Sequence, residues 1–217
     1  MTNFWCWFYK KYILVFCFLI LIITLGAFIA PLLAHYNAQN AAQLIYAMYG
    51  GTCHQLAYRS WFLFGNQAFY PLRLAGIQNM VPYEEVTGNS PSDLVSARIF
   101  IGDALTGFKT ALCQRDIAIN LGFILAGFGF ALSRRKWHPI PILYWITFGL
   151  FPLFFDGIFQ LGGDVFQGLN GSMGWESTPL LRTATGGLFG ITTGLFIFPK
   201  LEESLRIANN NHRCKEI

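Results

Sequence analysis

Four side chains that could bind a metal ion occur in two short clusters, Cys53-His54 and Cys113-Gln114-Arg115-Asp116. Thiolate, imidazole and carboxylate groups are the side chains that zinc accepts, usually in a tetrahedral set of four. The spacing of three between Cys113 and Asp116 lets one helical turn present both. Adjacent residues point in different directions in a regular element, so Cys53 and His54 would reach the same ion only from a turn. The clusters predict a site for zinc or a similar divalent metal, with these ligands: Cys53, His54, Cys113 and Asp116.

The same residues allow a second interpretation, a structural disulfide between Cys53 and Cys113. A bound metal with an open coordination position would activate a water molecule, and Asp156 and Glu176 would then be candidate catalytic bases of a membrane metalloenzyme. A disulfide would instead suit a non-catalytic accessory or assembly subunit of a larger membrane complex. The sequence leaves both classes of function open and specifies no substrate.

Composition places these residues in a membrane protein. Hydrophobic residues make up 54% of the 217 residues and charged residues only 12%, which is too apolar for a soluble domain. A helix of about 20 apolar residues crosses the hydrocarbon core of a bilayer, which is roughly 30 Å thick. We therefore predict an all-α, polytopic membrane helix bundle with four transmembrane helices, at about residues 12–34, 112–133, 140–160 and 179–199.

These spans divide the chain into a single membrane domain at 1–208, within it an outer segment at 35–111, and a polar cytoplasmic tail at 209–217. Lys10 and Lys11 before the first apolar run resemble the start of a secretory signal. That run is longer than the about 7–15 apolar residues of such signals, which favours an uncleaved anchor. Thr178 followed by Pro179 is typical of a helix start, and we expect the last span to end before Pro199.

Charge asymmetry gives the predicted orientation. The side that holds both termini carries nine of the 15 Lys and Arg residues, and the outer side carries eight of the 11 acidic residues. By the positive-inside rule the N- and C-termini are cytoplasmic, in a cell membrane that the chain crosses several times. The net charge of +4 is thus explained by the Lys and Arg residues on the cytoplasmic side, and we expect no nucleic-acid partner. Membrane lipid and protein partners in a membrane complex are the partners that we expect.

Polar residues gather at the outer ends of the predicted spans. A carboxylate at bilayer depth, such as Asp156, costs about 2.5–3.5 kcal/mol on insertion scales unless it is paired. Arg182 is its expected partner and Arg115 the second choice. A salt bridge that fixes the bundle and a direct role in chemistry are both open. The residues expected to support or orient the metal ligands are Arg59, Arg115, Gln160 and Arg182.

A stripe of small residues follows one face of the last span, at Gly186, Gly190 and Gly194. Small residues at this spacing let helix backbones approach closely in lipid. We expect the stripe to pack within the chain, against Gly122 and Ala126 of the second span. A homodimer interface is the alternative.

The outer segment is predicted to carry amphipathic helices that lie at the bilayer interface. Apolar and charged residues are mixed over 38–49 and 90–108, which is typical of helices on a membrane surface. The residues at 78–89 between them have the composition of a loop.

The order of five motifs resembles a family of small multi-pass prokaryotic membrane proteins that is known only as a domain of unknown function. The family has Cys-His-Gln with Arg-Ser, Cys-x-Arg-Cys, Asp-Gly-x-x-Gln, Glu-Ser-Thr and Arg-x-x-Thr-Gly. The matching residues are Cys53-His54-Gln55 with Arg59-Ser60, Cys113 to Asp116, Asp156 to Gln160, Glu176-Ser177-Thr178 and Arg182 to Gly186. The resemblance covers about 49–65 and 111–199. Asp116 replaces the second cysteine of Cys-x-Arg-Cys, and an insertion at 66–110 separates the two cysteine motifs. The resemblance implies a multi-pass membrane protein and no particular activity.

Overall fold

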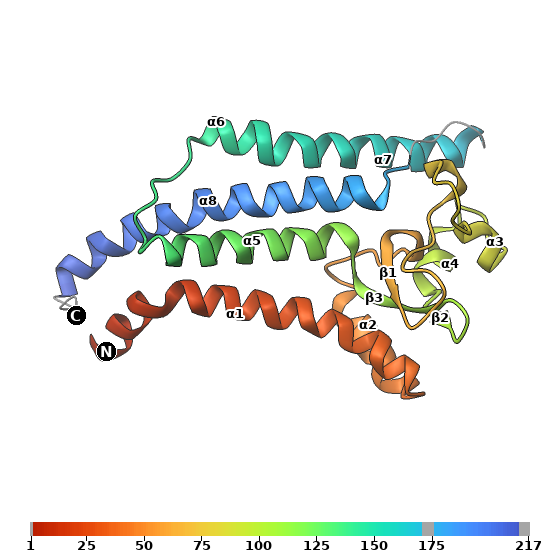
Figure 1. Cartoon of the computed structure of the whole chain (residues 1–217), viewed down its shortest axis with the longest axis horizontal. Coiled ribbons are helices and arrows are strands. Elements are labelled where there is room, and N and C mark those ends of the chain that lie inside the picture. Colours follow the sequence, from red (N-terminus) through yellow and green to blue (C-terminus); the bar gives the residue numbers. More distant parts are fainter. Residues whose placement is uncertain (1, 171–175, 213–217) are drawn as a thin grey trace.

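In the part of the chain that the structure describes, four long helical rods lie side by side, and a small folded cap closes one end of them (Figure 1). The structure is a computed structural model that describes residues 2–170 and 176–212. The rods are α1 (Thr2–His35), α5 (Gln114–Leu132), the continuous run of α6 (Ile142–Tyr144), η3 (Trp145–Leu150) and α7 (Phe151–Asn170), and α8 (Pro179–His212).

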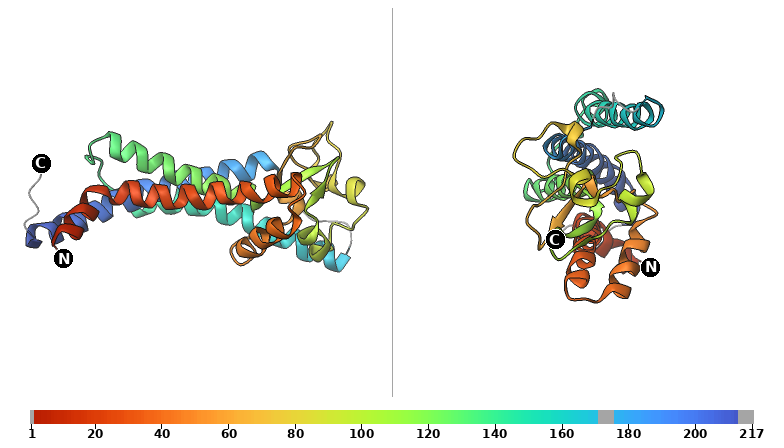
Figure 2. Two further views of the ribbon diagram at one scale, coloured as in Figure 1. Left: turned by 90° about the horizontal axis from the view of Figure 1, so that it is seen from below. Right: turned by 90° about the vertical axis from the view of Figure 1, so that its right-hand side faces the viewer.

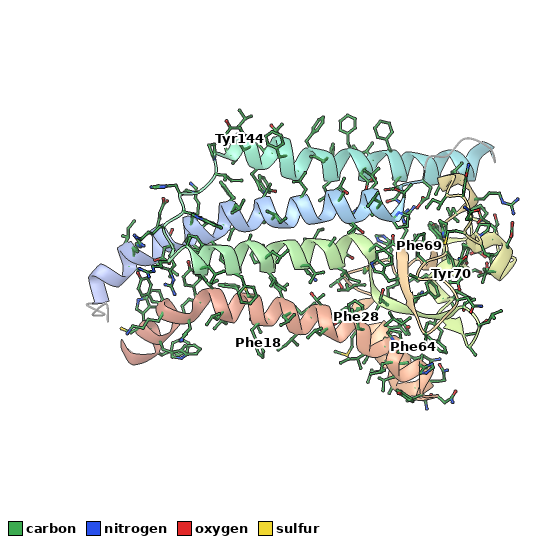
Figure 3. All side chains as sticks on the ribbon, in the orientation of Figure 1. Phe18, Phe28, Phe64, Phe69, Tyr70 and Tyr144 are labelled. Carbon is green, nitrogen blue, oxygen red and sulfur yellow. The ribbon has the colours of Figure 1, made fainter. Side chains whose placement is uncertain are left out.

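Each rod contains a stretch that is long and apolar enough to cross a membrane. These candidate spans are Phe4–His35, Gln114–Leu132, Ile142–Gln160 and Pro179–Ala208. Large apolar side chains project outward from the rods, such as Phe18 from α1 and Tyr144 from α6 (Figure 3), which are 61% and 54% exposed. Exposing so much apolar surface to water would be unfavourable, whereas lipid accepts it. The four apolar runs predicted from the sequence thus form four candidate membrane-spanning helices.

The rods form a row, with α5 and α8 in the middle and α1 and α7 on the outside (Figures 1 and 2). The closest packing is between α5 and α8, where the glycine stripe of α8 lies against the α5 backbone. A Cβ atom added to Gly190 would lie 2.1 Å from the carbonyl oxygen of Ile119, and one on Gly194 would lie 2.5 Å from the Cβ of Ala126. The α5–α8 contact therefore depends on the absence of side chains at these positions.

The start of α1 and the end of α8 lie together, at the end of the helix row opposite the cap (Figure 1). There the buried Glu202 accepts hydrogen bonds from Tyr9 and Tyr12 of α1, at 3.3 and 3.0 Å, and pairs with Arg135. The expectation that α8 ends before Pro199 is wrong, because the helix continues to His212. An interior proline costs about 3 kcal/mol in a helix, and the contacts of Glu202 with α1 stabilise the turn that follows it.

The all-α prediction is only approximate, because the cap contains a three-stranded antiparallel sheet. Its strands are β1 (Ser60–Leu63), β2 (Gly102–Asp103) and β3 (Gly107–Cys113), in the order β1-β3-β2. The strand β3 runs directly into α5, and β1 pairs with it so that Ser60 lies opposite Cys113. The sheet thus fixes the start of α5 relative to the segment that follows Cys53.

The short elements of the cap differ in part from the sequence prediction. They are α2 (Gln39–Tyr49), η1 (Ala57–Arg59), η2 (Arg73–Ala75), α3 (Tyr83–Thr87) and α4 (Leu94–Ile99). The helix predicted over 38–49 is present, but the one predicted over 90–108 is wrong beyond Ile99, and α3 lies in the predicted loop. Gly102 has φ +103° and Gly107 has φ +75°, so the chain turns there into the β2–β3 hairpin instead of continuing as a helix.

Lys109 is a fully buried lysine in the middle of β3. Its ammonium group donates hydrogen bonds to the carbonyl oxygens of Gln55 and Arg98, at 2.7 and 2.5 Å, and the Tyr46 ring lies 5.9 Å away. It therefore joins three parts of the cap through neutral acceptors. Burial lowers the pKa of Lys109 to about 7.

The first prediction concerns the α5–α8 contact. Gly190→Ala should lower the stability of the protein by about 1–3 kcal/mol, because the added methyl group meets backbone atoms of α5. Gly187→Ala is the matched control in the same helix, because a Cβ there would come no nearer than 4.0 Å to the neighbouring backbone. Thermal unfolding in detergent micelles measures both. Equal melting temperatures for the two variants would contradict the packing described here.

The second prediction concerns the pH dependence of stability. An unfolded lysine keeps its proton up to about pH 10.4, whereas Lys109 in the folded chain loses it near pH 7. The unfolded state binds more protons between these values, so stability contributed by Lys109 rises with pH, by at most about 1.4 kcal/mol per unit. Lys109→Met should remove this part of the slope between pH 7 and 10. Lys136→Met, at an exposed lysine, should keep it. Melting temperatures over this pH range are the measurement.

Candidate functional site

Cys113 lies at the junction between β3 and α5 and caps the helix. Its backbone is extended, with φ −74° and ψ 164°, and its sulfur accepts a hydrogen bond from the Asp116 N–H at 3.5 Å. Asp116 occupies the first turn of α5, where a negative charge interacts favourably with the helix dipole. The thiol of Cys113 and the carboxylate of Asp116 are thereby held at the same helix end.

Cys53 comes to this helix end from the segment after α2. Its sulfur accepts a hydrogen bond from the Cys113 N–H at 3.3 Å, and both cysteines are free thiols. The ligand atoms of Cys53, Cys113 and Asp116 all lie within 4.8 Å of one another. His54 is exposed and is not part of this group of three, although it lines the same cavity.

The environment of Cys113 favours the protonated thiol. Its hydrogen-bonding contact with Cys53, followed by burial, raises the pKa of Cys113 well above its ordinary value. A metal ion binds the thiolate, so binding here would release a proton. A metal site formed by these residues would therefore weaken as the pH falls.

A cavity of about 160 Å³ opens beside the three grouped residues. Polar side chains from four parts of the chain line it together with the thiols: His54, Gln55, Arg59, Arg115, Asp116, Gln160 and Arg182. Three guanidinium groups in one small cavity provide fixed donors for an anion. Asp156 and Glu176, the candidate bases, are absent from the lining in the part of the chain that the structure describes.

Glu176 is the centre of a buried ion network behind the cavity. Arg59 donates two hydrogen bonds to its two carboxylate oxygens, at 3.1 and 3.0 Å, and Arg182 forms a second ion pair with it. Gln160 donates to the same carboxylate at 3.0 Å. The side chains of Glu176 and Arg182 are each only 2% exposed. Glu176 thus joins η1, α7 and α8.

Asp156 completes the network from α7, and its partner is Arg115 of α5. The first-choice partner from the sequence, Arg182, is wrong, because Arg182 pairs with Glu176. Arg115 also donates to Gln160 at 3.1 Å, and Thr185 donates to the Asp156 carboxylate at 3.4 Å. Gln160 therefore connects the two ion pairs, as an acceptor from one arginine and a donor to the carboxylate of the other.

The sequence interpretation missed Gln114, which is fully buried. Its amide donates to the carbonyl oxygen of Ser60 at 3.1 Å and accepts a hydrogen bond from Arg182 at 3.3 Å. It ties the start of α5 both to β1 and to α8. A glutamine between a cysteine and an arginine at a helix start was the only available signal, and it does not specify which backbone the amide contacts.

The model of the family described as "Predicted membrane protein (DUF2085)" matches residues 103–196. The match covers less than half of the chain, and residues 103–196 are similar to this family. No curated protein and no solved structure matches the chain. The matched region includes Cys113, Asp116, Asp156 and Arg182, whereas Cys53 lies before it. The candidate site thus combines this region with residues from the preceding segment.

The third prediction tests the ion network. Arg115→Gln leaves the Asp156 carboxylate buried without its charged partner, and this should destabilise the protein by about 3–5 kcal/mol. The double variant Arg115→Gln/Asp156→Asn should recover part of the loss, because it buries no unpaired charge. Thermal unfolding in detergent gives the three values.

Arg73→Gln is the matched control for this measurement. Arg73 forms an ion pair with Glu85 in which the two side chains are 68% and 54% exposed. Exposed pairs contribute only about 0–1 kcal/mol, so this variant should unfold like the wild type. A loss for Arg115→Gln as small as that for Arg73→Gln would show that the buried pair does not stabilise the helix row.

Proposed function

We propose that this membrane protein binds one zinc-like divalent metal ion through Cys53, Cys113 and Asp116, at the outer boundary of the membrane. The observation that carries the proposal is the convergence of the three ligand atoms to within 4.8 Å of one another. In a tetrahedral zinc site with bonds of about 2.0–2.3 Å, the ligand atoms lie about 3.3–3.8 Å apart. Small adjustments of these side chains would meet that geometry.

Three protein ligands leave one position of a tetrahedral ion open, which is typical of catalytic rather than structural zinc sites. In this chain the open position would face the cavity that contains Arg59, Arg115 and Arg182. A metal-bound water is a nucleophile near neutral pH, and the arginines would hold an anionic group beside it. The arrangement suits metal-assisted hydrolysis of an anionic ester, that is, a membrane metalloenzyme.

Asp156 and Glu176 fit a positioning role in this proposal better than the role of catalytic bases. Each is buried and held by arginine, and neither borders the cavity as described. A carboxylate that is paired in this way has little freedom to move. Their function would be to orient Arg115 and Arg182 toward the anion.

The proposed orientation places both termini in the cytoplasm and the cap outside. The excess of Lys and Arg lies at the end of the helix row that holds the termini, including Arg134, Arg135 and Lys136 after α5. The site then faces the outer leaflet, where water and lipid headgroups are both available. Membrane lipid is the first partner that this position offers.

A second candidate function, a non-catalytic subunit held by a Cys53–Cys113 disulfide, follows from the same contact. The hydrogen bond from the Cys113 N–H to the Cys53 sulfur places the two sulfurs close together. Oxidation would join the cap to the start of α5 and leave no thiolate for a metal. Metal content and thiol state together distinguish the two candidates.

The fourth prediction is the metal content of the purified protein. Wild type should contain about one zinc ion per chain, and both Cys113→Ser and Asp116→Asn should lose most of it. Serine is a good helix N-cap, so Cys113→Ser keeps the capping contact of α5 and should stay folded. Cys17→Ser, at a free cysteine within α1, is the matched control and should retain the metal. Elemental analysis by mass spectrometry is the measurement.

A metal-free wild type would contradict the proposal. Comparing the mobility of the same samples in non-reducing and reducing electrophoresis then supports the second candidate, if reduction shifts the wild type more than it shifts Cys113→Ser. Stoichiometric co-purification of another membrane protein would support the subunit function further.

A further inference from the structure

A groove of about 620 Å³ runs between α4 and α7, next to the cavity of the candidate metal site. Exposed apolar side chains of α4 form one wall, namely Leu94, Val95 and Ile99, of which the last two are 67% and 70% exposed. Gly157 of α7 lines the opposite side. A Cβ atom added there would meet only Arg115, at 3.9 Å, so the glycine leaves room for a ligand.

Three arginines, Arg59, Arg98 and Arg115, line the same groove. Within the part of the chain that the structure describes, no acidic side chain lines it. Arg98 is exposed and forms no ion pair there; its guanidinium group donates to the carbonyl oxygen of Gly50 at 2.8 Å. The groove therefore offers positive charge directly beside an apolar surface, and its occupant should combine an anionic group with a hydrocarbon chain.

The position of the groove selects among such molecules. It opens beside the outer half of α7, whose neighbouring side chains Phe155 and Phe159 are 45% and 52% exposed on the lipid-facing surface. The groove lies at the depth where this apolar rod meets the cap, because Arg59 and Arg98 come from the cap and Gly157 from α7. A lipid of the outer leaflet presents its phosphate at that depth and its acyl chain along the helix.

We propose that this groove binds a single anionic phospholipid, with the phosphate on Arg59, Arg98 and Arg115 and one acyl chain between α4 and Gly157. The site does not require the metal, because no cysteine lines the groove. The bound phosphate would also lie next to the cavity of Arg59 and Arg115, so the groove is a means of bringing a lipid headgroup to the candidate metal site.

The fifth prediction is the lipid selectivity of the full-length protein in detergent. Native mass spectrometry should show that 1-palmitoyl-2-oleoyl-phosphatidylglycerol binds at least about 10-fold more tightly than the matching phosphatidylcholine. Arg98→Gln should weaken binding of phosphatidylglycerol about 10-fold, because it removes one charge-assisted contact. Gly157→Leu should abolish it by filling the groove, and leucine favours the helix more than glycine does, so folding should be kept. Arg73→Gln, an arginine of the cap outside the groove, is the control and should bind like the wild type.

Equal affinity for the two lipids, or undiminished binding of phosphatidylglycerol to Gly157→Leu, would overturn the proposal. Inorganic phosphate that binds as tightly as phosphatidylglycerol would overturn it too, because the acyl chain would then contribute nothing. Cys113→Ser should bind the lipid like the wild type. The lipid site can therefore be established or rejected whatever the outcome of the metal analysis.

Discussion

The ion network around Glu176 and Asp156 is the interaction on which the junction between the helix row and the cap depends. Glu176, Asp156 and Arg182 are removed from water there, each with a side chain 2% exposed, whereas Arg59 and Arg115 are 15% and 20% exposed. Such a group is costly unless nearly every charge has a partner. The partners come from η1, α5, α7, the segment before α8, and α8 itself, so the network can be satisfied only when all of these elements are in place.

The network matters most for α7, because that rod lies at the edge of the row and packs chiefly on α8 (Figure 1). Lipid removes most of the hydrophobic driving force between helices, so an edge helix needs polar or close-packed contacts. Asp156 and Gln160 supply them at the end near the cap, and toward the other end of this rod Trp145 donates a hydrogen bond to Thr193 at 3.0 Å. These contacts explain the motif Asp-Gly-x-x-Gln in structural terms, and Gly157 between them borders the groove next to α4.

Much of the helix row could be predicted from the sequence, because a membrane span is specified by the length of an apolar run. The start of α8 could also be predicted, since Thr178 accepts a hydrogen bond from the Leu181 N–H just as a capping residue should. The sheet could not. Lysine is usually a surface residue, yet Lys109 is buried because carbonyl groups of distant segments accept its hydrogen bonds. Strand pairing between residues about 50 apart leaves no periodic signal in either segment.

The candidate site could be predicted only in part. The three side chains that lie together, Cys53, Cys113 and Asp116, are among the four expected ligands, whereas His54 lies outside this group. The partner of Asp156 could not be predicted, because it depends on which helix packs beside α7 and on the position of Glu176. Glu176 pairs with both Arg59 and Arg182, and Asp156 pairs with Arg115. That division of charges also explains why the cavity side of the network is positive: Asp156 and Glu176 lie behind the arginines, and the guanidinium groups line the cavity beside the two thiols and the groove.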